Sequence, residues 1–162
     1  MKKDYSFSYT SYISSDALSE EDRQLLKEAR LAVDKAYAPY SNFKVGAAAL
    51  LKSGEIISGA NQENASYPAG ICAERVVLAT VSSLYTNAVI TKMAISFFNV
   101  NGNSNYPITP CGFCRQALLE TIHHTGQSMQ LILSGMDGEV WMIEDARQLL
   151  PLSFTGNDLK RK

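Results

Sequence analysis

All three cysteines of the chain lie in two short stretches, Cys72-Ala73-Glu74-Arg75 and Pro110-Cys111-Gly112-Phe113-Cys114-Arg115-Gln116. Three thiolates can hold zinc and leave its fourth tetrahedral position open, as in a catalytic site, whereas a structural site closes all four positions. We therefore predict one Zn²⁺ per chain, bound by Cys72, Cys111 and Cys114. Water in the open position would lie near Glu74, which we predict to be the catalytic proton carrier.

The spacing of the cysteines favours helix starts. Cys111 and Cys114 are three residues apart, so in the first turn of a helix they share one face and can occupy two corners of a tetrahedron. Pro110 is typical of such a start. If Cys72 opens a second helix, two positive helix ends converge on the metal and stabilise the thiolates.

A ligand, a spacer, a non-ligand Glu and a later Pro-Cys-x-x-Cys form the known signature of zinc nucleobase deaminases. Further segments agree with it, and together they resemble the small, homotetrameric, zinc-dependent cytidine deaminases of nucleoside salvage. The resemblance runs in unbroken order over roughly residues 20–160. The additional segments are Tyr40-Ser41-Asn42-Phe43-Lys44-Val45-Gly46-Ala47, Asn61-Gln62-Glu63-Asn64 and Leu149-Leu150-Pro151-Leu152-Ser153-Phe154.

The resemblance also implies roles around the metal. Asn61 and Glu63 would hydrogen-bond the ribose hydroxyls, and Phe43 would pack against the pyrimidine. Backbone near Ala73 would position the base, and Arg75 would donate hydrogen bonds to thiolate sulfur.

The late aromatic residue, Phe154, matches one that the family supplies from a neighbouring subunit, which would make the active site composite. Without the family resemblance, these residues could also have ordinary structural roles. Glu63 could be an ordinary loop carboxylate, and Phe154 could anchor the C-terminal tail of its own subunit.

The function that the resemblance implies is hydrolysis of cytidine and deoxycytidine to uridine and deoxyuridine with release of ammonia. One alternative is a related Cys-Ala-Glu deaminase that acts on a nucleoside analogue such as blasticidin S, although the Asn61–Asn64 segment argues against it. Another is a non-catalytic zinc or redox module in which Cys111 and Cys114 form a dithiol.

Composition narrows the class of protein. With 162 residues, 46% of them hydrophobic, the chain suits one compact domain with a sizeable core. A formal net charge of -1 gives no electrostatic reason to bind nucleic acid, so a small-molecule substrate is favoured. No apolar run approaches the roughly 18 residues of a membrane span. An odd number of cysteines fits a reducing compartment, so we expect a cytoplasmic protein.

The pattern along the chain predicts an α/β fold, namely a three-layer α/β/α sandwich around a five-stranded mixed sheet with a parallel middle. Residues 1–18 lack periodicity and are interpreted as a flexible extension, which leaves residues 19–162 as a single catalytic domain. Expected helices start at Ser19, Cys72 and Cys111, with a short one near residues 144–150. Expected strands are 45–51, 55–60, 91–98, 129–133 and 140–143, and the first two and the last two form antiparallel pairs.

Overall fold

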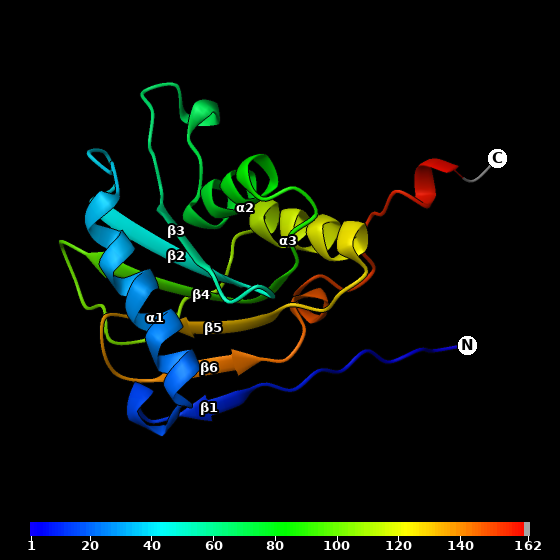
Figure 1. Ribbon diagram of the computed structural model, residues 1–162, viewed down its shortest axis with the longest axis horizontal. Coiled ribbons are helices and arrows are strands. Elements are labelled where there is room, and N and C mark those ends of the chain that lie inside the picture. Colours follow the sequence, from blue (N-terminus) through cyan, green and yellow to red (C-terminus); the bar gives the residue numbers. More distant parts are fainter. Residues whose placement is uncertain (161–162) are drawn as a thin grey trace.

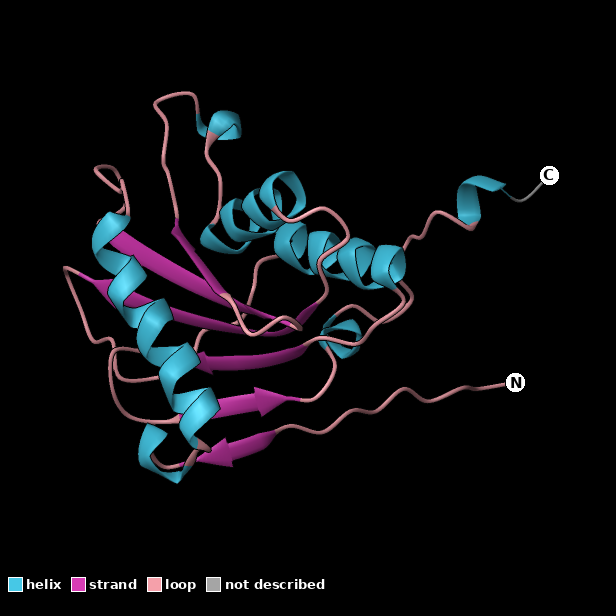
Figure 2. Cartoon of the chain, in the orientation of Figure 1, coloured by secondary structure: helices cyan, strands magenta, loops and turns pink. Residues whose placement is uncertain are grey.

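The computed structural model describes residues 1–160 and has three layers (Figure 1). A six-stranded mixed sheet forms the middle layer, in the order β1-β6-β5-β4-β2-β3. Helix α1 covers one face, and α2 and α3 lie together on the other (Figures 1 and 2). The strands are β1 (Thr10–Tyr12), β2 (Phe43–Leu51), β3 (Ile56–Ala60), β4 (Ile90–Asn99), β5 (Gln130–Ser134) and β6 (Val140–Ile143). The helices are α1 (Glu20–Ala32), α2 (Ala73–Leu84) and α3 (Gly112–Thr125), with short 3₁₀ turns that include η4 (Ala146–Leu149).

Helix α1 begins as the sequence predicts. The side chain of Ser19 accepts a hydrogen bond from the backbone amide of Asp22 and so caps the first turn. Leu25, Leu26 and Ala29 recur at helical spacing and are fully buried against the sheet. This face fixes α1 across the middle strands.

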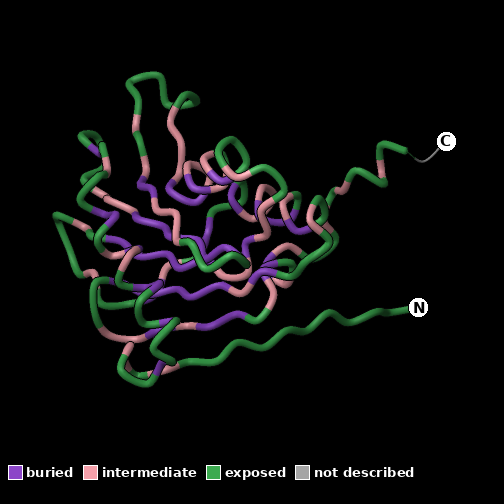
Figure 3. The backbone as a smooth tube through the Cα atoms, viewed as in Figure 1, coloured by how far each residue is buried: buried purple, intermediate pink, exposed green. Residues whose placement is uncertain are grey.

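Strand β2 separates two hydrophobic layers because successive side chains point to opposite faces of a sheet. Ala47, Ala49 and Leu51 join the core beneath α2 and α3. Ala48 and Leu50 join the core beneath α1. Figure 3 shows the resulting concentration of buried residues along the central strands.

The expected strand count was wrong by one. Thr10–Tyr12, within the segment interpreted as a flexible extension, pairs antiparallel with β6 and adds an edge strand. Contacts distant in sequence hold it, since the ring of Tyr9 lies 5.0 Å from that of Trp141. The α/β class and the three layers are confirmed.

The parallel middle of the sheet is confirmed only in part. Strands β4 and β5, joined through α3, are parallel neighbours. Strand β2 lies between β3 and β4 and pairs antiparallel with both, so the crossover through α2 skips a strand. As a result, α2 and α3 lie on the same face and begin close together.

Candidate functional site

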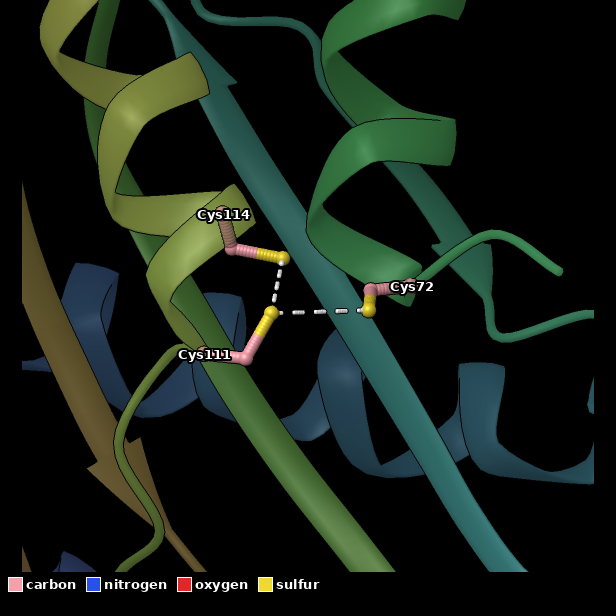
Figure 4. A group of neighbouring side chains, drawn as sticks. All are labelled: Cys72, Cys111 and Cys114. Carbon is pink, nitrogen blue, oxygen red and sulfur yellow. Dashed lines mark hydrogen bonds between the residues drawn. The ribbon is translucent and has the colours of Figure 1, made fainter. Parts of the chain in front are cut away.

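The three cysteine sulfurs meet where α2 and α3 begin (Figure 4). The Sγ atoms of Cys72 and Cys111 are 3.8 Å apart, and those of Cys111 and Cys114 are 3.5 Å apart. All three lie within 4.8 Å of one another. Zinc–sulfur bonds of about 2.3 Å at tetrahedral angles require sulfurs about 3.8 Å apart, so the group fits zinc.

Helix ends place two of these cysteines. Cys72 is the N-cap residue of α2 and Cys111 that of α3, and neither helix has a side-chain cap in that position. The unpaired backbone amides of both first turns therefore give the sulfurs a positive surrounding. Cys114, one turn into α3, is fully buried.

The surroundings favour thiolate at one of the three sulfurs. Hydrogen bonding from Cys114 lowers the pKa of Cys72 to about 6. The same interaction, together with burial, raises the pKa of Cys114. Three thiolates this close together repel one another, so a divalent cation would be needed to hold them.

Glu74 lies in the first turn of α2, two residues after Cys72, and is only 4% exposed. Burial raises the pKa of this carboxyl group, and a hydrogen bond with the Cys114 thiol opposes that effect. A buried carboxyl group beside the three cysteines can take up and release a proton. The neighbouring Ala73 is fully buried and forms the first residue of α2.

A cleft of about 760 Å³ opens beside Cys72. Its volume lies within the range of small-molecule sites, about 300–1,000 Å³. Asn61, Glu63 and Arg75, all named in the sequence analysis, are among its lining residues. The other lining residues are Tyr40, Ser41, Gln62, Asn64, Tyr67, Pro68, Gly70, Ile71, Cys72 and Phe113.

One oxygen of the Glu63 carboxylate is held by backbone. Its Oε2 accepts hydrogen bonds from the amides of Tyr40 at 2.9 Å and Ser41 at 3.3 Å. A hydrogen bond from the Ser41 hydroxyl lowers the pKa of Glu63, and these backbone amides lower it further. These bonds fix the carboxylate in place and favour its ionised form.

Asn61 also binds the start of β2. Its side-chain oxygen accepts from the Val45 amide at 2.8 Å, and its amide nitrogen donates to the Phe43 carbonyl at 3.0 Å. Asn61 therefore holds the segment that carries Phe43. The ring of Phe43 stacks on the buried Phe97 at 4.9 Å and does not line the cleft.

The two remaining residues of the expected site, Arg75 and Phe154, lie in different places. Arg75 lines the cleft, and its charge helps to lower the pKa of Cys72. Phe154 is exposed, lies in the tail after η4 and is absent from the cleft wall. Its carbonyl accepts a hydrogen bond from Gln116 at 3.0 Å.

The sequence analysis gave no role to several residues around the cleft. The amides of Tyr40 and Ser41 hold Glu63. The sequence signal for this arrangement is the turn-forming residue Asn42, which has a positive φ of 57° in the structure. Tyr67 and Phe113 line the cleft and are 77% and 81% exposed. A single sequence offers no signal for such exposure.

Comparison with known proteins agrees with this geometry. Residues 19–125 match the family model described as the cytidine and deoxycytidylate deaminase zinc-binding region. The chain belongs to this deaminase family. The matched region, which binds zinc in this family, contains Cys72, Cys111 and Cys114, the group of side chains that could hold a metal ion.

The matches to the following three relatives extend over nearly the whole length of each relative. A cytidine deaminase of Halalkalibacterium halodurans is 39% identical to this deaminase over 85% of the chain and 98% of the relative. The crystal structure of cytidine deaminase from Burkholderia pseudomallei has a TM-score of 0.71 and 36% identity, covering 85% of this chain and 100% of that one. The enzyme from Mycobacterium tuberculosis has a TM-score of 0.64 and 29% identity, with coverages of 85% and 99%. Within residues 1–160, no helix of the deaminase has the length and apolar character to cross a membrane.

Proposed function

We propose that this deaminase hydrolyses cytidine and deoxycytidine to uridine and deoxyuridine and releases ammonia. The observation that carries the proposal is the convergence of three thiol sulfurs within 4.8 Å beside a buried carboxyl group, Glu74. Relatives named cytidine deaminase, similar over most of the chain, support the choice of substrate.

Bound by Cys72, Cys111 and Cys114, zinc would supply a Lewis acid that makes water nucleophilic near neutral pH. Glu74 accepts a proton from the attacking water at a carboxylate oxygen and passes it to N3 of the pyrimidine. It then delivers the second proton of that water to the departing amino group, so that C4 exchanges its C–N bond for C=O. Burial of Glu74 suits this role because it brings the acid and base forms closer in energy.

The sugar would occupy the cleft beside Glu63. The carboxylate of Glu63 would accept a ribose hydroxyl, and Asn61 supports the adjacent wall, so a ligand without a sugar would leave hydrogen-bonding capacity of the site unused. Phe43, whose ring stacks on Phe97 outside the cleft wall, would support the pyrimidine site from behind, at the strand start that Asn61 holds. Backbone beside Ala73 would face the base, and Arg75 would offset the negative charge of the thiolates.

We further propose that residues 19–162 act as one catalytic domain in a homotetramer, with Phe154 completing the site of a neighbouring subunit. The exposure of Phe154 in its own chain supports this composite site. A cytoplasmic location is proposed because the three zinc ligands must remain reduced.

Ammonia release from a panel of cytosine, cytidine, deoxycytidine, CMP and blasticidin S tests the substrate. We expect fast turnover of the two nucleosides, very slow turnover of cytosine and slow turnover of CMP, because Arg75 is the only cation among the described residues that line the cleft around Glu63. Faster turnover of CMP or blasticidin S would overturn the assignment.

Metal analysis of the untreated protein tests the chemistry separately. One zinc per chain and thiols that react only after chelation are expected. Three rapidly reacting thiols without zinc would contradict the proposal and favour the redox module.

A further inference from the structure

We propose that Arg115 is a positioning residue that couples the zinc ligand Cys111 to the root of the C-terminal tail. The inference rests on the proposed zinc ligands. It concerns a side chain that follows Cys114 directly and takes no part in the proposed chemistry.

Each nitrogen of the Arg115 guanidinium has its own acceptor. Nε donates to the carbonyl of Pro110 at 2.8 Å, and Nη2 donates to the hydroxyl of Thr109 at 3.1 Å. Nη1 donates to the carbonyl of Leu149 at 3.0 Å. One rigid fork therefore joins the segment before the metal ligand to the end of η4.

The Pro110 carbonyl matters because it shares a planar peptide unit with the nitrogen of Cys111. Cys111 is exposed, so packing does not determine where its sulfur lies, whereas the sulfur of Cys114 is fixed by complete burial. The hydrogen bond from Arg115 thus supplies the restraint that burial supplies at Cys114. Loss of this restraint should leave one of the three sulfurs poorly placed for the metal.

The other end of the fork is also anchored. Leu149 is 7% exposed and belongs to the core beneath α2 and α3. The tail leaves the body just after it, and Gln116, next to Arg115, donates to the carbonyl of Phe154 at 3.0 Å. Two adjacent residues of α3 therefore hold the segment before the zinc ligand, the root of the tail and the tail itself.

Such coupling works in both directions. Zinc that fixes Cys111 should hold Pro110 against Arg115 and so reduce the motion of the chain just after Leu149. A tail held in place, for example by a neighbouring subunit, should in turn slow the release of zinc.

The test uses the zinc-loaded protein and the variants Arg115→Gln, Arg115→Lys and Arg147→Gln. Arg147 is the matched control because it lies in η4 and its side chain bonds to Asp145, without a bond to residues 109–111. The rate of zinc transfer to excess chelator is measured first. We expect about a tenfold rise for Arg115→Gln and a similar rise for Arg115→Lys, whose single ammonium cannot reach three acceptors, with no change for Arg147→Gln.

The second readout is the hydrogen exchange of residues 150–156. If Arg115 only stabilised the fold, the rate of this exchange would not depend on zinc. Chelation should speed this exchange in the wild-type protein while the amides of β4 and β5 stay protected. In Arg115→Gln the exchange should be fast with or without zinc.

Three results would each overturn the coupling. Arg115→Gln could release zinc at the wild-type rate, or Arg147→Gln could raise the rate of zinc release as much as Arg115→Gln does. The hydrogen exchange of residues 150–156 in the wild-type protein could also stay the same after chelation. If Arg115→Gln fails to fold, the rate of zinc release from Arg115→Lys and the zinc dependence of hydrogen exchange in the wild-type protein test the coupling instead. A wild-type protein that binds no zinc at its cysteines overturns the proposed function as well, whereas zinc binding without coupling overturns this inference alone.

Discussion

The side-chain oxygen of Asn61 accepts a hydrogen bond from the backbone amide of Val45 at 2.8 Å. With the bond that Asn61 donates to the Phe43 carbonyl, the side chain pairs with β2 as a neighbouring strand would. Glu63 does the same for the turn before it through the amides of Tyr40 and Ser41. The two residues that the family resemblance assigns to the sugar are therefore also the residues that shape the cleft.

Asn61→Asp should weaken this arrangement. A carboxylate can accept from Val45 but cannot donate to the Phe43 carbonyl, so two acceptors would face each other. We expect a loss of about 1–3 kcal/mol in the free energy of unfolding and a higher KM for cytidine. Urea unfolding and steady-state kinetics measure both. Asn64→Asp is the control, since Asn64 uses only its oxygen, to accept from Ser66, and unchanged unfolding of Asn61→Asp would contradict the argument.

Glu74→Gln should abolish deamination while the protein keeps its zinc. The amide has nearly the same shape but cannot take up a proton, and loss of a general base costs about 100-fold or more in kcat. Zinc content and kcat are measured on the same preparation, with Glu120→Gln on the exposed side of α3 as the control. A variant that lost its metal would identify Glu74 as a ligand instead.

Gly46→Ala should destabilise the fold. A Cβ at this position in β2 would come within 2.7 Å of the backbone nitrogen of Val33 and closer still to the carbonyl oxygen of Ala29. Because the obstacle is backbone, α1 itself would have to move, at a cost of about 3 kcal/mol. Thermal unfolding tests this, and Gly156→Ala, where a Cβ meets nothing within 4 Å, should leave the midpoint unchanged. Equal midpoints for the two variants would show that α1 adjusts freely.

Lys92 should stabilise the protein in a pH-dependent way. Burial acts to lower the pKa of Lys92, but hydrogen bonds to Asp22 and Glu21 outweigh it and raise the pKa above its ordinary value of 10.5. A raised pKa means that the stabilisation is complete below about pH 10.5 and is lost as the pH rises through the folded-state value. Lys92→Met should cost about 2 kcal/mol at pH 8, and the difference from wild type should shrink above pH 10.5.

Urea unfolding at pH 8 and at a series of pH values above 10.5 measures that difference. Lys27→Met is the control, because Lys27 is an exposed lysine of α1 with no ion pair in the described part of the chain. A difference between Lys92→Met and wild type that persisted unchanged at high pH would rule out the ammonium as its source.

The sequence predicts the parts of the molecule that depend on local chemistry. Capping by Ser19, the apolar spacing of Leu25, Leu26 and Ala29, and the three-residue spacing of Cys111 and Cys114 all act within one or two turns, so they can be recognised in the sequence. The metal group follows because two helix starts and three cysteines leave few other arrangements.

The features that the sequence missed depend on partners far along the chain. Strand β1 forms because Thr10–Tyr12 pairs with the edge of β6, about 130 residues later in the chain. The sequence of residues 1–18 has no periodicity that would predict this pairing. The hydrogen bonds of Asn61 to β2 and those of Arg115 to Leu149 likewise join segments that meet only in the folded protein. Composition cannot reveal such pairings, because Asn and Arg are as common in solvated loops.

The sulfurs of Cys72 and Cys111 stand 39 positions apart in the chain, with a helix and a strand between them. No short segment can therefore form the proposed metal site by itself, because its three sulfurs come together only where α2 and α3 lie side by side. Zinc bound there would close a long loop, and the free energy of its binding would become part of the free energy of folding. In a cell short of zinc, newly made chains would lack this closure, and the supply of metal would affect how much folded protein accumulates as well as how much of it is active.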